Sequence, residues 1–157
     1  MLETPQVIQT TTQLTAAIHL TIPRDQIEQA MCPAVSEVMA AIAAQGIAPV
    51  GPVFSYHFRI EPGLFDFEVG VPVGRPVAAA GRVKPSQLPA AKVAMAAYRG
   101  PYEGLGGAWG AWGELGAWIK ANGHTPGAGL WESYAVGPES GPDPASWRTE
   151  LHRVLMG

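Results

Sequence analysis

The sequence predicts an α+β fold made of two similar halves, each running strand, helix, strand, strand. The main observation is an internal repeat. Gly46 and Pro49 recur 77 positions later as Gly123 and Pro126, each pair leading into an apolar and aromatic segment. The same offset places residues 16–18 on 93–95, so that it links a strand, a helix and a strand. Several matches in the same order favour a duplication over chance.

A second offset of 82 positions continues the repeat toward the C-terminus. It pairs Phe65 with Trp147 and Glu68 with Glu150. The five extra residues fall in the Gly- and Pro-rich segment 137–146, where an insertion costs little. We therefore expect a single domain over residues 1–157, with one half at about 7–74 and the other at about 75–157.

Hydrophobic periodicity predicts the elements of the first half. Apolar residues at Ile27, Met31, Val38 and Ile42 have helical spacing. Pro33 should break or kink this helix, because proline removes a backbone donor, and Gly46 should end it. The expected elements are a strand at 13–21, a helix from about 23 to 45, and strands at 54–58 and 65–71.

The second half shows the same succession of patterns. The expected elements are a strand at 92–99, a helix at 104–122, and strands at 130–136 and 147–155. The helix has an apolar stripe that includes Trp112, Leu115 and Ile119. It is also rich in glycine, which costs about 1 kcal/mol per residue in a helix interior, so packing must hold it in place.

Composition excludes several classes of function. The net charge is −3 and the ten basic residues are scattered, which disfavours a nucleic-acid partner. No apolar run reaches membrane-spanning length, and no signal peptide begins the chain, so we expect a cytoplasmic protein. Cys32 is the only cysteine and the four histidines are far apart, so we expect no disulfide, metal or other cofactor.

The strand around Glu132 carries the strongest candidate for a ligand contact. Alternation places Leu130, Glu132 and Tyr134 on one face and Trp131 on the other. A carboxylate among apolar and aromatic neighbours is costly to bury unless something pairs with it. Either Glu132 is exposed or paired with an arginine such as Arg148, or it accepts a cationic or hydrogen-bonding ligand between aromatic rings.

Further aromatic residues are candidate walls of the same site. Trp147 precedes the last strand, although core packing would also explain it. Tyr102 lies at a strand-to-helix turn, a common place for ligand contacts. The remaining candidate ligand contacts are Trp112, Trp131, Phe54 and Tyr56.

These residues resemble the GyrI-like family, whose domains also serve as effector-binding domains of AraC-type and MerR-type transcription regulators. The resemblance runs from about residue 7 to 155, with its motifs in order across both halves. It rests on the segments 46–52 and 67–73 in the first half and on 99–105, 108–112, 123–126, 130–134 and 143–151 in the second.

The resemblance implies a pseudo-twofold fold with a ligand cleft between the halves. In multidrug-sensing members, a glutamate among aromatic walls contacts amphipathic aromatic cations. That glutamate corresponds to Glu132 and a wall residue to Trp147, with a positional match at Tyr102 and Trp112. We therefore expect a small-molecule-binding protein that takes a hydrophobic, cationic aromatic compound.

Two other functions are implied by the same resemblance. Some relatives suggest hydrolysis of cyclopropane-containing genotoxins, for which Glu132 and Tyr102 would be the catalytic candidates. A protein-interaction role, such as gyrase inhibition, is the weaker alternative. Few residues precede the first strand, so we expect no DNA-binding domain and no direct transcription regulator. The sequence does not predict an oligomeric state.

Overall fold

The computed structural model describes residues 2–61, 63–101, 104–105, 110–136, 143 and 146–156. The chain forms two compact units. The first unit is Thr11–Ala90, and the second unit combines Met1–Thr10 with Ala91–Gly157. In the described residues each unit has a four-stranded antiparallel sheet and one α-helix, which confirms the predicted α+β class.

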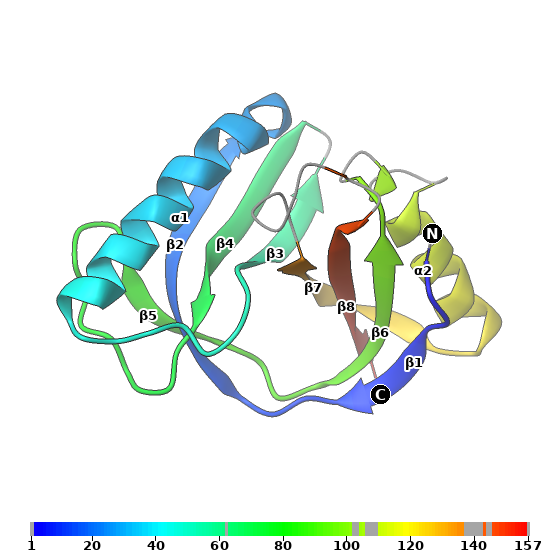
Figure 1. The fold of residues 1–157 in the computed structure, drawn as a ribbon. Coiled ribbons are helices and arrows are strands. Elements are labelled where there is room, and N and C mark those ends of the chain that lie inside the picture. Colours follow the sequence, from blue (N-terminus) through cyan, green and yellow to red (C-terminus); the bar gives the residue numbers. More distant parts are fainter. Residues whose placement is uncertain are drawn as a thin grey trace. The chain divides into compact units, whose positions relative to one another are not determined.

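The first unit contains the helix α1 (Ile27–Ala44), which follows a short 3-10 turn (Arg24–Gln26). Its strands run in the order β3-β4-β2-β5, and α1 lies along one face of the sheet (Figure 1). Ile18, Val38 and Phe67 are fully buried in the core between them. The strands are β2 (Gln13–Pro23), β3 (Phe54–Glu61), β4 (Leu64–Pro72) and β5 (Lys84–Leu88).

Pro33 was predicted to break or kink the first helix; the break does not occur, and a kink stays a prediction. The helix runs without interruption from Ile27 to Ala44 with Pro33 inside it. Proline leaves the carbonyl four residues earlier, that of Gln29, without its helical donor. Both Pro33 and Gln29 are exposed, so solvent can hydrogen-bond the carbonyl that the helix leaves unpaired.

The second unit contains the helix α2 (Ala111–Ala121) and a sheet in the order β1-β6-β8-β7. Leu115 and Ile119 pack into its core against Leu151. The helix is shorter than the predicted 104–122, and its N-cap is Gly110. The weak helix propensity of glycine explains why the regular helix begins only after Gly110. The strands are β1 (Gln6–Gln9), β6 (Lys92–Arg99), β7 (Thr125–Val136) and β8 (Arg148–Met156).

Both helices end in the same backbone geometry. Gly46 follows α1 with φ 71°, and Gly123 follows α2 with φ 77°. In each case the next amide donates to the carbonyl of the last helical turn, Ile47 to Ile42 and His124 to Ile119. This is the Schellman arrangement, which needs a left-handed residue and therefore favours glycine. The two glycines are the repeat positions identified from the sequence.

Both units contain the succession of strand, helix, strand and strand that the sequence predicted. The two remaining strands, β1 and β5, were not predicted. β5 pairs with β2 and β1 pairs with β6, so the compact units divide the chain near residues 10 and 90 rather than near 74. A pseudo-twofold relation between the halves stays a prediction.

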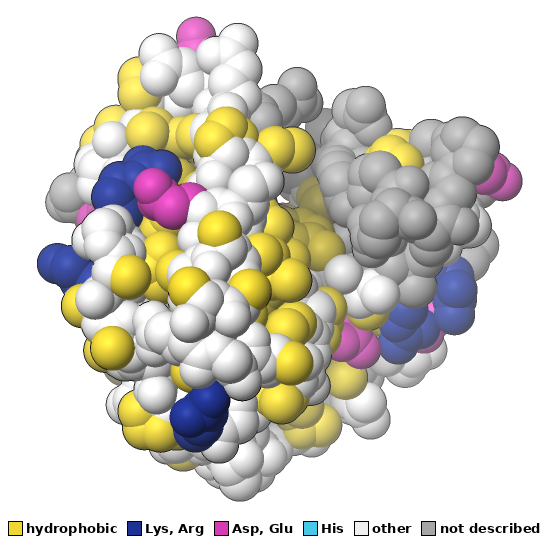
Figure 2. Space-filling view, turned by 60° about the vertical axis from the view of Figure 1, so that its left-hand side comes forward, with side chains coloured by type: hydrophobic (Ala, Val, Ile, Leu, Met, Phe, Trp, Pro, Cys, Tyr) yellow, Lys and Arg dark blue, Asp and Glu magenta, His cyan; other side chains and the backbone are white. Residues whose placement is uncertain are grey.

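Hydrophobic and polar side chains are interspersed over the face that carries α1, and charged side chains there are few (Figure 2). This agrees with the low content of charged residues, 15% of the chain. No helix in the described part of the chain is long and apolar enough to cross a membrane.

His57 makes the stability of the first unit depend on pH. Its ring is buried and stacks on Phe67, with centroids 5.2 Å apart. Burial lowers the pKa of His57 from 6.5 to about 4, because the protonated ring would lose its hydration. The unfolded chain therefore binds the proton more tightly than the folded chain, and stability falls as the pH drops from 6.5 toward 4.

We predict that proton binding at His57 alone lowers the free energy of unfolding by about 2 kcal/mol when the pH falls from 7 to 5. A His57→Phe variant keeps an aromatic ring at this position but has no proton to bind. Urea unfolding at the two pH values should show a smaller loss of stability in the variant than in the wild type. Equal losses in both proteins would contradict this assignment.

Candidate functional site

The Glu132 carboxylate lies between two aromatic hydrogen-bond donors in the second unit. The indole N–H of Trp112 donates to Oε2 over 2.6 Å, and the Tyr134 hydroxyl donates to Oε1 over 2.8 Å. Tyr134 is two residues further along β7, so strand alternation keeps it on the same face as Glu132. Trp112 comes from the first turn of α2. The structure thus brings together three of the candidate residues.

The start of α2 fixes the position of the Trp112 indole. Gly110 is extended at the N-cap, and the amide of Trp112 donates to the Leu105 carbonyl over 3.0 Å. Leu115, three residues later, is fully buried. Because side chains three residues apart on a helix lie close together, burial of the apolar stripe brings Trp112 toward the β7 face that carries Glu132.

Two opposing effects act on the acidity of Glu132. Burial raises the pKa of its carboxyl group above the ordinary value of 4.5 and is the larger effect, while the hydrogen bonds from Trp112 and Tyr134 lower it. No ion pair to Glu132 occurs among the described residues. Arg148, the partner considered from the sequence, lies instead 3.4 Å from Glu3 and 3.5 Å from Glu150.

Trp131 belongs to the opposite face of β7. Its ring is buried and stacks on His152, with centroids 4.7 Å apart and an angle of 7° between the planes. His152 pairs with Trp131 in the β7–β8 register, whereas Glu132 pairs with Leu151, a core residue on the α2 side. Alternation therefore separates Trp131 from the Glu132 carboxylate, as the sequence pattern indicated.

Phe54 and Tyr56 lie on β3 in the first unit. In the register of β3 with β4, Phe54 pairs with Gly70 and Tyr56 with Glu68, on the face of the sheet away from α1. Burial, followed by the charge of Glu68, raises the pKa of Tyr56. The roles of Phe54 and Tyr56 as ligand contacts stay predictions.

The two other aromatic candidates flank elements of the second unit. Trp147 directly precedes β8, and its carbonyl accepts a hydrogen bond from the Gly100 amide over 3.0 Å. Trp147 is partly buried. Tyr102 lies outside the described residues. Ligand contact at Trp147 and Tyr102, and catalysis by Tyr102, stay predictions.

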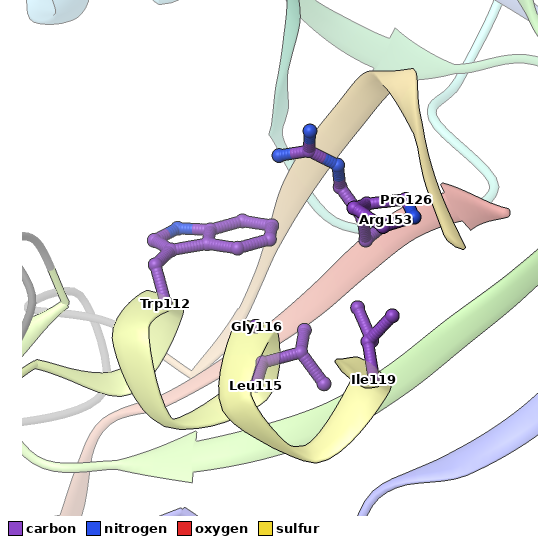
Figure 3. A pocket seen from close by; sticks show the side chains of 6 residues that line it. All are labelled: Trp112, Leu115, Gly116, Ile119, Pro126 and Arg153. Carbon is purple, nitrogen blue, oxygen red and sulfur yellow. The ribbon is translucent and has the colours of Figure 1, made fainter. Parts of the chain in front are cut away.

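A hollow of about 100 Å³ opens beside the same helix (Figure 3). Trp112 lines it and also donates to Glu132, so the indole connects the hollow to the carboxylate. Arg153 was not predicted from the sequence, because its hydrogen bond to the Gly127 carbonyl depends on the register shift between Pro126 and Leu130 in β7. The lining residues are Trp112, Leu115, Gly116, Ile119, Pro126 and Arg153.

This arrangement suits the binding of a small, largely apolar molecule. Aromatic and aliphatic side chains supply contact area, and a few polar groups supply orientation. The carboxylate of Glu132 can accept a hydrogen bond or face a cation. Its raised pKa also allows it to exchange a proton closer to neutral pH than an ordinary glutamate does.

Known structures share this fold. The C-terminal domain of EcmrR is 20% identical, with a TM-score of 0.84 over 98% of this chain and 97% of that domain. SAV2435 bound to tetraphenylphosphonium is 14% identical, with a TM-score of 0.66 over 99% of this chain and 95% of that one. A hydrolase from Listeria innocua is 12% identical, with a TM-score of 0.66 over 97% and 91%.

The structure of EcmrR in a DNA complex is also 20% identical, with a TM-score of 0.83 over 97% of this chain. This chain spans only 57% of the length of that EcmrR chain. No curated protein matches the sequence significantly. The GyrI-like small molecule binding domain matches residues 9–152, which is most of the chain. The protein therefore belongs to the GyrI-like family of small-molecule-binding domains, as its sequence motifs indicated.

Proposed function

We propose that this domain binds a hydrophobic, cationic aromatic compound next to the Glu132 carboxylate. The observation that carries the proposal is that neutral donors alone, Trp112 and Tyr134, hold this carboxylate among the described residues. When ionised, Glu132 is therefore a partly buried negative charge that forms no ion pair with any described residue. A bound cation would supply a counter-charge.

The chemistry of the surroundings favours a large, weakly hydrated cation over a small one. A compact ammonium or metal ion would have to give up a strong hydration shell to enter an aromatic site. A cation whose charge is spread over aromatic groups loses less hydration. It also gains contact with the Trp112 and Tyr134 rings, and cation–π attraction reaches about 2 kcal/mol when desolvated.

The fold supports the same class of ligand by analogy. SAV2435, which shares the fold, was solved with tetraphenylphosphonium. Tetraphenylphosphonium is a hydrophobic aromatic cation of the kind that the Glu132 site would accept. At 14% identity, the likeness itself shows only a shared fold. The proposal for this chain therefore depends on its own Glu132, Trp112 and Tyr134.

Hydrolysis is a second candidate function because Glu132 is suited to proton transfer. Burial raises the pKa of this carboxyl group, and a general acid or base works best when its pKa is near the working pH. A hydrolase also shares the fold. For this chain, the proposed substrates would be cyclopropane-containing genotoxic compounds, with Glu132 assisting the attack of water.

We predict that Glu132→Gln weakens the binding of tetraphenylphosphonium by about 10-fold or more, because it removes the counter-charge of the cation. The amide is a matched replacement: its oxygen can accept from Trp112 and its NH2 can donate to the Tyr134 hydroxyl. Titrations followed by tryptophan fluorescence or calorimetry would measure the two affinities. Triphenylphosphine oxide, a neutral compound of similar shape, should lose less than about 2-fold.

The matched control is Glu114→Gln, because Glu114 is an exposed glutamate on α2. This variant has the same loss of charge at the protein surface and should bind tetraphenylphosphonium as the wild type does. Equal weakening of the cation and of the neutral compound in Glu132→Gln would contradict the charge-based proposal. So would equal weakening of cation binding by the two variants.

We predict that cation affinity in the wild type rises with pH through the pKa of Glu132, above 4.5. The protonated carboxyl offers no charge to the ligand, and binding of a cation must release its proton. Calorimetric titration of tetraphenylphosphonium from pH 4.5 to 8.5 would show this rise. The Glu132→Gln variant should lack this component, and an identical pH profile in both proteins would refute the assignment.

For the second candidate, incubation with a panel of cyclopropane-bearing genotoxins should yield water-addition products of the opened ring, detected by mass spectrometry. Glu132→Gln should abolish their formation while the protein stays folded by circular dichroism. Absence of any product across the panel would leave ligand binding as the function of the site.

A further inference from the structure

Arg153 is a cation that forms no ion pair with any described residue and lies beside apolar side chains. It comes from β8 and lines the hollow together with Leu115 and Ile119. Its Nε–H donates to the Gly127 carbonyl over 3.0 Å, which holds the side chain in place. No carboxylate lies within ion-pair distance of Arg153 among the described residues, although three other arginines, Arg82, Arg99 and Arg148, have such partners.

The Nε hydrogen bond leaves the two terminal nitrogens of Arg153 available. Burial lowers the pKa of the guanidinium because its hydration is incomplete, although the group stays charged at neutral pH. A guanidinium fork matches a carboxylate in shape, and the two form paired, charge-assisted hydrogen bonds. A partly desolvated arginine with free terminal donors is therefore suited to bind an organic anion.

The hollow provides space for the apolar part of such an anion. Figure 3 shows Trp112, Leu115 and Ile119 projecting from α2 on one side and Arg153 from β8 on the other. A Cβ atom added at Gly116 would meet nothing within 4 Å, so this part of the wall is open. An engineered apolar cavity of about 150 Å³ holds benzene, so this smaller, open hollow of about 100 Å³ has room for a short alkyl chain or for part of a ring, with the rest of the ligand outside it.

We propose that this hollow is a second subsite, which binds a small organic carboxylate with an apolar body. The guanidinium of Arg153 holds the carboxylate, and the apolar body packs between Trp112 and the α2 residues Leu115 and Ile119. The subsite is distinct from the Glu132 site in charge, because one attracts anions and the other attracts cations. The two sites share the Trp112 indole, which donates to Glu132 through its N–H.

The β7–β8 register places the two charges near each other without pairing them. Arg153 is opposite Leu130, and Glu132 is two residues further along β7 on the same face. Such diagonal neighbours are typically about 7–8 Å apart at Cα. No ion pair joins them in the described structure, because the Arg153 Nε–H is directed to Gly127 and both carboxylate oxygens accept from aromatic donors.

The test compares phenylacetate with phenylacetamide, its neutral analogue of nearly the same shape. Amide NMR titration of the wild type should show phenylacetate binding about 10-fold more tightly. The largest shifts should occur at Gly116 and at the Trp112 indole N–H. Equal affinity for the two compounds, or shifts confined to other residues, would overturn the proposal.

Two kinds of variant test separately the role of the Arg153 charge and the role of the space in the hollow. Arg153→Gln should remove the preference for the carboxylate. Gly116→Leu should fill the hollow and weaken both compounds, without unfolding the helix, since leucine is a better helix former than glycine. Its matched control is Ala117→Leu, at an exposed neighbouring position that does not line the hollow. A preference that survives Arg153→Gln would contradict the proposal.

The variants distinguish this subsite from the cation site, although the two share the Trp112 indole. Glu132→Gln should leave the preference for phenylacetate in place, and Arg153→Gln should leave tetraphenylphosphonium binding unchanged or strengthened. Loss of phenylacetate binding in Glu132→Gln would mean that the compound occupies the cation site, and would overturn the assignment to Arg153.

Discussion

The desolvation of one carboxylate, that of Glu132, shapes the chemistry of the second unit. Water is partly replaced around it by aromatic groups, which disfavours its negative charge. Two neutral donors from different elements, Trp112 on α2 and Tyr134 on β7, offset part of that cost. Each carboxylate oxygen accepts one hydrogen bond from these neutral donors, which do not neutralise the charge. Among the described residues, ionised Glu132 therefore has hydrogen bonds but no ion pair, and we propose that a bound cation forms this pair.

The packing of α2 ties this site to the hydrophobic core. The buried residues Leu115 and Ile119 hold the helix against the sheet, although Gly113 and Gly116 weaken its intrinsic stability. Gly116 leaves space beside the helix, where the hollow with Arg153 opens. The glycine-rich composition of this helix, unexplained in the sequence, thus acquires a physical reason at Gly116. A larger side chain there would occupy space that a ligand can use.

The two units share their element order but differ in chemistry at equivalent positions. Ser55 occupies the repeat position of Glu132 and hydrogen-bonds His57 on the same strand over 3.3 Å. The first unit uses this position to stabilise a buried polar pair beside its aromatic core. The second unit places a carboxylate there. If the halves arose by duplication, as the sequence repeat predicts, this position kept its place in the strand and changed its side chain, so that only the second unit has the glutamate.

The sequence alone determined the α+β class, the order of the elements in each half, the ending of the first helix at Gly46 and the placement of Glu132 and Tyr134 on one strand face. These features depend on local periodicity and backbone conformation, which neighbouring residues specify. Tertiary structure decided the features that sequence periodicity does not specify. It kept α1 continuous through the exposed Pro33, paired the short strands β1 and β5, and selected Trp112 rather than Arg148 as the partner of Glu132. It also left Arg153 beside an apolar hollow, because contacts between distant segments depend on how the helix packs on the sheet.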